Sequence, residues 1–202
     1  IDPGPSPRFG KSDARELVEA LGHPNGWWRD EAQKLLVLRK DSKSIALLRN
    51  AVTNAKSGFA RAHALWTLDG MGVWDESLVL HGISDKSVEV RLAALRVAGE
   101  RILYHEASDA LLEAVSQSLP DDALEVATQR LLSLSLHQKQ TKAFAVRPGH
   151  TERVMKAAGE FIDKPVLAKA FMVALNPVEY LPALQTLSGN PRFHRKDHPL
   201  PQ

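Results

Sequence analysis

Residues 25–119 of this chain contain no proline, although the full sequence has 12. Proline breaks the interior of a helix because it has no amide hydrogen and its ring clashes with the preceding turn. The same stretch is rich in alanine, leucine, arginine and glutamate, which favour helices. No segment shows a sustained period-two alternation of β-branched residues, which would indicate a strand. The sequence therefore predicts an all-α protein.

A pattern of about thirty residues recurs within this stretch, in the segments WRDEAQKLL, ARAHALWTL and VRLAALRVA. Each copy contains an arginine, then an alanine three residues later and an apolar residue after seven. The positions are Arg29, Arg61 and Arg91, Ala32, Ala64 and Ala94, and Leu36, Leu68 and Ala98. Alanine lets two helices approach closely, and the aliphatic residues fill the seam between them. One helical hairpin cannot cover its own apolar face, so neighbouring hairpins should stack into an α-solenoid.

The arrangement resembles HEAT repeats, in which a recurring aspartate and arginine form a ladder between units. Asp85 and Arg91 match this pair, whereas His23 and Ala55 stand at the other aspartate positions. Ala127 stands where a fourth copy would carry its arginine. We therefore expect about four HEAT-like hairpins with an incomplete ladder, followed by a divergent helical C-terminal part.

Proline, glycine and apolar patterns divide the chain into five segments. We expect an extended Pro-rich lead-in at 1–11, HEAT-like repeats at 12–137, a linker at 138–150, a divergent helical segment at 151–188 and an extended tail at 189–202. The first residue is isoleucine rather than methionine, so we expect the chain to be an excerpt or a processed product.

Charge and cysteine content exclude several classes of function. A net charge of +2 gives no strong field for nucleic acid or an anionic membrane, and no apolar run is long enough for a transmembrane segment. With no cysteine, the chain cannot contain a disulfide, a cysteine nucleophile or a Cys-x-x-Cys-His haem attachment. We expect no catalytic, cofactor-binding or metal-binding residue, and no enzyme activity in this chain alone. An acid–base site assembled from scattered carboxylates and histidines is the open alternative.

Two residue pairs could suggest chemistry, but a structural interpretation suits each better. His194 and His198 have the spacing of two metal ligands on a helix, yet the neighbouring prolines argue against a helix there. Asp121 and Asp122 are adjacent and would point to different sides of a helix, so capping explains them better than acid–base catalysis.

Two adjacent tryptophans at the start of one helix raise the question of a partner surface. Trp28 lies four residues before Ala32 and so belongs to the apolar stripe of its helix. Trp27 lies about 100° away around the helix, where core packing and a partner surface are equally good interpretations. The candidate partner interface comprises His23, Asn25, Trp27, Arg29, Arg61, His63 and Trp66.

Two stretches, LGHPNGWWRDEAQKLLVLR (21–39) and ARAHALWTLDGMG (60–72), resemble the HEAT-repeat segment of large membrane-bound dehydrogenases of planctomycetes and verrucomicrobia. In that family a sorbosone-dehydrogenase-like β-propeller precedes the repeats and a c-type cytochrome follows them. The opening IDPGPSPRFGKSDARELVEAL resembles the junction between propeller and repeats. The resemblance is specific over residues 1–103 and vaguer to residue 137.

The resemblance implies a non-catalytic scaffold that positions a dehydrogenase propeller and a cytochrome domain within a larger redox protein. It implies haem c elsewhere in the polypeptide, no cofactor in this chain, and a periplasmic or cell-envelope location. The partners would be neighbouring domains of the same polypeptide or another protein. Trp28 would then hold the first hairpin together, while His23, Asn25 and Trp27 would face the neighbouring domain.

The alternative is a stand-alone HEAT solenoid that binds protein or nucleic acid. A nucleic-acid surface would need Arg29, Arg61 and Arg91 exposed along one face to contact phosphates. An arginine at this repeat position more often pairs between repeats, so we interpret the three as structural.

Overall fold

The computed structural model describes residues 8–105, 107–139, 149–158, 164–175 and 177–188. Every regular element in these residues is a helix, which confirms the prediction of an all-α protein. None of the helices in this part of the chain combines the length and hydropathy needed to span a bilayer. The chain divides into two compact units, Ile1–Val97 and Ala98–Gln202, each of which has its own packing.

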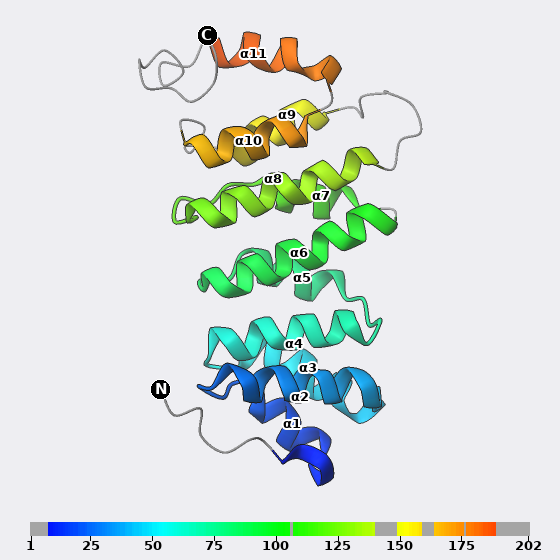
Figure 1. The fold of residues 1–202 in the computed structure, drawn as a ribbon. Helices are drawn as coiled ribbons and strands as arrows, with labels where there is room; N and C mark the ends of the chain where they lie inside the picture. Colours follow the sequence, from blue (N-terminus) through cyan, green and yellow to red (C-terminus); the bar gives the residue numbers. More distant parts are fainter. Residues whose placement is uncertain (1–7, 106, 140–148, 159–163, 176, 189–202) are drawn as a thin grey trace. The chain divides into compact units, whose positions relative to one another are not determined.

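The first unit is built from helix pairs. Its elements are η1 (Phe9–Lys11, a 3-10 helix), α1 (Ala14–Ala20), α2 (Gly26–Arg39), α3 (Ser42–Asn54), α4 (Gly58–Gly70), α5 (Glu76–Ile83) and most of α6 (Val88–Tyr104). Helix α1 packs on α2, and α3 packs on α4. Contacts between α1 and α3 and between α2 and α4 join consecutive pairs, and α2 and α4 lie side by side in Figure 1.

Polar side chains define where several of these helices begin. Asp13 forms a capping box with Glu16 before α1, and Asn25 accepts a hydrogen bond from the Trp27 amide before α2. Asp41 caps α3 by accepting from the Lys43 amide. Such caps satisfy amide groups that have no partner within the helix. The cap at Asn25 also fixes the start of α2, so the turn before this helix contains His23 and Asn25 of the candidate interface, and Trp27 lies in the first turn of the helix.

The periodic alanine and aliphatic positions form the core, as the repeat pattern predicts. Ala32, Ala64 and Ala94 are fully buried, and their partners seven residues after the arginines are buried as well. Gly82 extends this close packing, because a Cβ atom there would lie 2.8 Å from Ala94 Cβ and 2.9 Å from Leu65 Cδ1. Small residues therefore let α5 approach α4 and α6 closely.

The second unit continues with paired helices. Its elements after α6 are α7 (Asp109–Ser116), α8 (Leu124–Lys139), α9 (His150–Ala158), α10 (Pro165–Ala174), η3 (Pro177–Glu179) and α11 (Tyr180–Ser188). Helix α9 packs on α7 and α8, and α10 packs on α8. The segment after residue 150 therefore shares a compact unit with α7 and α8.

Several segment boundaries expected from the sequence fall elsewhere in the structure. Residues 9–11, expected in the extended lead-in, form η1 with Phe9 buried. Residues 138–139 of the expected linker belong to α8, and its last residue, His150, begins α9. Residues 1–7 of the lead-in, 140–148 of the linker and the tail at 189–202 lie outside the described residues.

Candidate functional site

The turn between α1 and α2 is built around Trp28. The His23 ring stacks on the Trp28 indole, with ring centroids 4.5 Å apart and an angle of 14° between the planes. Phe9 meets the same indole edge-on, with centroids 5.5 Å apart. Trp28 is half-buried, so it covers the first helix pair at its rim and does not lie in the deep core. It thereby links η1 to the turn that precedes α2.

The same turn directs Trp27 to solvent. The Asn25 amide donates to His23 Nδ1 at 3.1 Å, and Asn25 Oδ1 accepts from the Trp27 amide at 3.0 Å. These bonds fix the backbone on both sides of Asn25, while the Trp27 side chain is 65% exposed. A turn held by two local hydrogen bonds therefore presents the Trp27 indole to solvent.

Arg29 connects this turn to the second helix pair. Its Nη1 donates to the carbonyl oxygens of His23 and Pro24 at 2.8 and 2.9 Å. Its Nε donates to His63 Nε2 at 3.3 Å. The guanidinium also lies over the Phe59 ring, 4.4 Å from the centroid, which is a cation–π contact. One side chain thus joins the α1–α2 turn to two positions on α4.

His63 is held between α2 and its own helix. Its Nδ1 lies 2.6 Å from Gln33 Oε1. Since Nε2 accepts a hydrogen bond from Arg29, the proton of the neutral ring must sit on Nδ1, which donates to Gln33. The Trp66 indole packs edge-on against the ring, with centroids 5.3 Å apart. Burial lowers the pKa of His63, the positive charge of Arg29 lowers it further, and Asp30 offsets part of this effect.

A groove runs over α2, α4 and α6 next to this contact. It consists of two hollows of about 500 and about 320 Å³ that share Asp30, His63 and Trp66. We call it the α2–α4–α6 groove. Its remaining polar and apolar lining includes Arg29, Gln33, Lys34, Leu38, Phe59, Glu89, Leu92 and Arg96. The groove thus combines the aromatic side chains and arginines that are enriched in protein interfaces with charged side chains of both signs.

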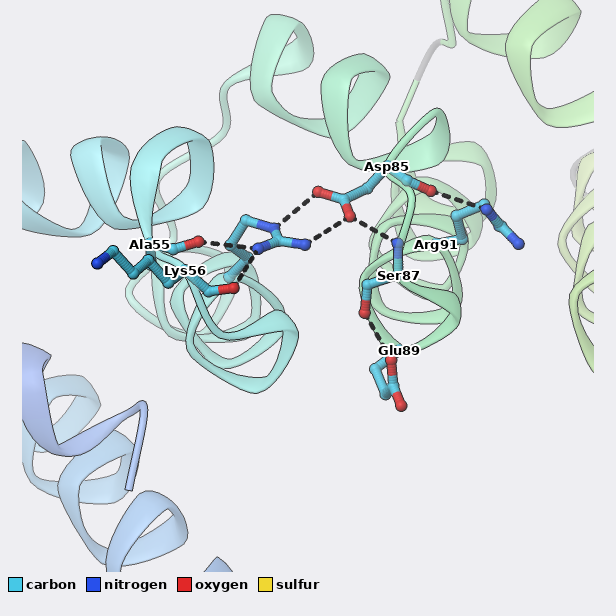
Figure 2. A network of polar contacts seen from close by, with 7 residues as sticks. Ala55, Lys56, Asp85, Ser87, Glu89 and Arg91 are labelled. Atoms are coloured by element: carbon cyan, nitrogen blue, oxygen red, sulfur yellow. Dashed lines mark hydrogen bonds and ion pairs between the residues drawn. The ribbon is translucent and has the colours of Figure 1, made fainter. Parts of the chain in front are cut away.

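Arg61 does not belong to this surface, which corrects its place in the expected interface. Its side chain is buried and makes a bidentate ion pair with Asp85, with Nε–Oδ2 and Nη2–Oδ1 distances of 2.8 and 2.7 Å. Its Nη1 donates to the carbonyl oxygens of Ala55 and Lys56. Figure 2 shows Asp85 facing these carbonyl groups across the boundary between two helix pairs. A carboxylate supplied by the following turn therefore holds Arg61 in the interior.

Asp85 also organises the turn that begins α6. Its Oδ1 accepts from the Ser87 amide at 2.8 Å, and its carbonyl oxygen accepts from Arg91 Nη1 at 2.8 Å. Burial alone would raise the pKa of the Asp85 carboxyl, but hydrogen bonds from Arg61 and Ser87, together with the nearby positive charge of Arg61, lower the pKa below its usual value. Asp85 thus joins Arg61 of one pair to Arg91 of the next, and both arginines are buried.

A comparable ion pair in the second unit escaped the sequence interpretation. Arg130 is fully buried, and its Nε donates to Asp122 Oδ2 at 2.8 Å. Its Nη1 donates to the carbonyl oxygens of Ala114 and Val115. The repeat pattern pointed to Ala127, about one helical turn earlier, as a position that had lost its arginine. A search that allowed a shift of one turn would have found Arg130.

The structure brings part of the predicted interface together and adds residues to it. Arg29, His63 and Trp66 meet in the α2–α4–α6 groove, whereas His23, Asn25 and Trp27 form the adjoining turn. Gln33 and Phe59 were missed. Gln33 lies four residues after Arg29 on the same face of α2, a spacing that could have revealed it.

Comparison with models of protein families and with curated protein sequences finds no match for this chain. Among the described residues, no group of three or more histidine, aspartate or glutamate side chains is placed to hold a metal ion.

Proposed function

We propose that this chain is a HEAT-like scaffold and interaction domain of a larger redox protein, in which it positions a dehydrogenase propeller and a cytochrome domain. The observation that carries the repeat assignment is a bond made three times at equivalent positions. Each repeat arginine donates to the carbonyl oxygen six residues before it. The pairs are Arg29 with His23, Arg61 with Ala55 and Arg91 with Asp85.

The packing of the first unit also supports stacked repeats. Contacts between α1 and α3 and between α2 and α4 place equivalent helices of consecutive pairs against each other. The Arg61–Asp85 ion pair then joins α4 to the turn between α5 and α6. Stacking of this kind buries an apolar face that a single hairpin would leave exposed. The full proposal is an α-solenoid of about four such hairpins followed by a divergent helical part.

The proposed partner surface is the α2–α4–α6 groove together with the α1–α2 turn. Leu38 and Phe59 at the groove are 69% and 46% exposed, and Trp27 stands on the adjoining turn. An exposed tryptophan such as Trp27 is a typical anchor of a protein interface. We assign this surface to a neighbouring domain of the same polypeptide, the propeller. Haem c elsewhere in the protein and a periplasmic or envelope location follow from the resemblance of residues 21–39 and 60–72.

The gene's full open reading frame is the first test of this proposal. We expect it to encode a β-propeller before these residues and a Cys-x-x-Cys-His motif after them. A frame that encodes neither would contradict the redox part of the proposal and leave a stand-alone solenoid.

Calorimetry of this chain with the separately produced propeller is the second test. The Trp27→Ala variant should bind at least about tenfold more weakly, because loss of an anchor in an interface costs roughly 1–2 kcal/mol or more. Tyr104→Ala is the matched control, since Tyr104 is exposed to a similar degree and belongs to the second unit. Equal affinities of the two variants would count against the assigned surface.

The alternative of a nucleic-acid-binding solenoid loses its main support. That alternative needs Arg61 and Arg91 at the surface, and both side chains are buried. We expect no gel retardation of duplex DNA or RNA at low salt. Retardation that weakens steeply with added salt would favour the alternative.

A further inference from the structure

Arg29 and Arg61 differ in the residue that the following turn places next to the guanidinium group. Asp85, in the turn before α6, pairs with Arg61. Ala55 holds the equivalent position in the turn before α4 and brings no carboxylate to Arg29. The Nε–H of Arg29 instead donates to the neutral imidazole of His63. The polar contact that Arg29 makes with α4 therefore involves a histidine, whose charge can change with pH.

The geometry of His63 leaves no place for a second ring proton. Nδ1 already donates to Gln33 Oε1, and Nε2 accepts from Arg29 Nε at 3.3 Å. A proton on Nε2 would set two donors and two positive charges against each other at that distance. The contact with Arg29 must then break or lengthen.

The charges around His63 come from two neighbouring helices. Among the described residues, the hollows at His63 are lined by α2, α4 and α6 alone. Helix α2 contributes Arg29, Asp30 and Lys34, and α6 contributes Glu89 and Arg96. The carboxylates of Asp30 and Glu89 line the same hollow as Arg29. A released guanidinium therefore has acidic groups nearby to which it can move.

We propose that the Arg29–His63 contact is a pH-sensitive latch that controls the conformation of the α1–α2 turn. Through this turn the latch controls the affinity of the partner surface, and this effect on affinity rests on the proposed function. With His63 neutral, Arg29 is held toward α4 and binds the carbonyl groups of His23 and Pro24. When His63 gains a proton, Arg29 moves away, the turn loosens and partner affinity falls. The exposed Trp27 is then carried on a less rigid turn.

The direction of the pH response follows from the pKa of His63. Burial and Arg29 lower this pKa in the folded state, so between the folded-state pKa and the unfolded value of about 6.5 the unfolded chain binds more protons. The contribution of His63 to stability is therefore complete above pH of about 6.5 and is lost as the pH falls toward the folded-state pKa. The latch is closed at neutral pH and opens in acid.

Nitrogen NMR of the imidazole rings in the intact chain tests the closed state without any variant. Free imidazole side chains favour the proton on Nε2, whereas we expect His63 at pH 7.5 to carry it on Nδ1. A proton on Nε2 at that pH, or a His63 pKa at or above about 6.5, would overturn the proposal.

Hydrogen exchange at the Trp27 amide tests the opening, since this amide is bonded to Asn25 in the turn. On lowering the pH from 7 to below the His63 pKa measured in the NMR titration, after correction for the intrinsic pH dependence of exchange, we expect its protection to fall by about threefold or more. His63→Gln offers Arg29 an amide oxygen that does not titrate, so the loss of protection in acid should be clearly smaller than in the wild-type chain. His105→Gln, at an exposed histidine of the second unit, should keep the wild-type response.

A wild-type response in His63→Gln would refute the latch. Because none of these measurements needs a partner, they also separate the two proposals. If Trp27 binds nothing while the exchange at its amide still depends on His63, the proposed function fails and the latch stands.

Discussion

The first and second helix pairs use the same arginine position in two different ways. Arg29 and Arg61 both donate to the carbonyl oxygens six and five residues before them. Arg61 then forms a buried bidentate pair with Asp85, whereas Arg29 reaches a neutral imidazole and lies on Phe59. The hydrogen bonds to the preceding carbonyl groups are common to both repeats. The further partner of each arginine depends on which residue the following turn places next to it.

This difference separates a structural contact from an adjustable one. A buried charge pair is costly to break, because each partner left alone is a desolvated charge. The Arg29 guanidinium lies at the rim of a groove, and its histidine partner can change charge. The same arginine position thus forms a fixed ion pair in one repeat, Arg61 with Asp85, which we call the clamp. In the preceding repeat it forms a contact that depends on protonation, Arg29 with His63, which we call the conditional contact.

The largest expected effect is that of Arg61→Ala. It leaves the carboxylate of Asp85 buried without its cation, so we expect a loss of about 3–5 kcal/mol in the free energy of unfolding. Arg29→Ala should cost about 1–2 kcal/mol, since it removes hydrogen bonds at a partly exposed site. Urea denaturation at pH 7 measures both. Equal losses would remove the distinction between clamp and conditional contact.

Trp28→Ala should have the next largest effect. The variant loses stacking on His23 and the edge-on contact with Phe9, each an aromatic contact of about 0.5–1.5 kcal/mol, together with part of its apolar burial. We expect the free energy of unfolding to fall by about 2–3 kcal/mol, measured by thermal and urea denaturation. A change below about 0.5 kcal/mol would show that the turn does not depend on Trp28.

Ala55→Asp tests whether a carboxylate converts the conditional contact into a clamp. The new side chain can accept from the Ser57 amide, as Asp85 does from Ser87, and can pair with Arg29. We expect a gain of up to about 1 kcal/mol at pH 7. The decrease in stability due to His63 as the pH falls below about 6.5 should become smaller, because Arg29 no longer relies on the imidazole. An unchanged pH profile would mean that the two positions are not equivalent.

Trp27→Ala should have the smallest effect on the isolated chain. The side chain is exposed, so we expect the free energy of unfolding to change by less than about 0.5 kcal/mol. Denaturation alongside Trp28→Ala provides the measurement. A loss comparable to that of Trp28→Ala would assign Trp27 to packing and remove it from the partner surface.

Much of the fold could be read from residue spacing. The proline-free stretch, with its alanine and leucine at fixed distances from each arginine, predicted helices and a buried stripe, and both were found. The spacing did not reveal Arg130, which lies about one helical turn after Ala127. Its guanidinium donates to carbonyl groups 15 and 16 residues before it, whereas the three repeat arginines donate to the carbonyl group six residues before them.

The candidate site was harder to predict, because its contacts cross between helices. Nothing within the segment around Arg61 shows that the side chain is buried, since Asp85 lies 24 residues away along the chain. The contact of Arg29 with His63 likewise spans 34 residues. Both could be placed only after the helices had been packed.

The sequence by itself determined the secondary structure and the apolar stripes of this protein, because helix propensity and periodicity are local properties of the chain. Only the tertiary structure decided which arginine is a buried clamp and which is a conditional contact. The physical reason is that desolvation and charge pairing depend on side chains brought in by the next turn, and that turn is distant in sequence.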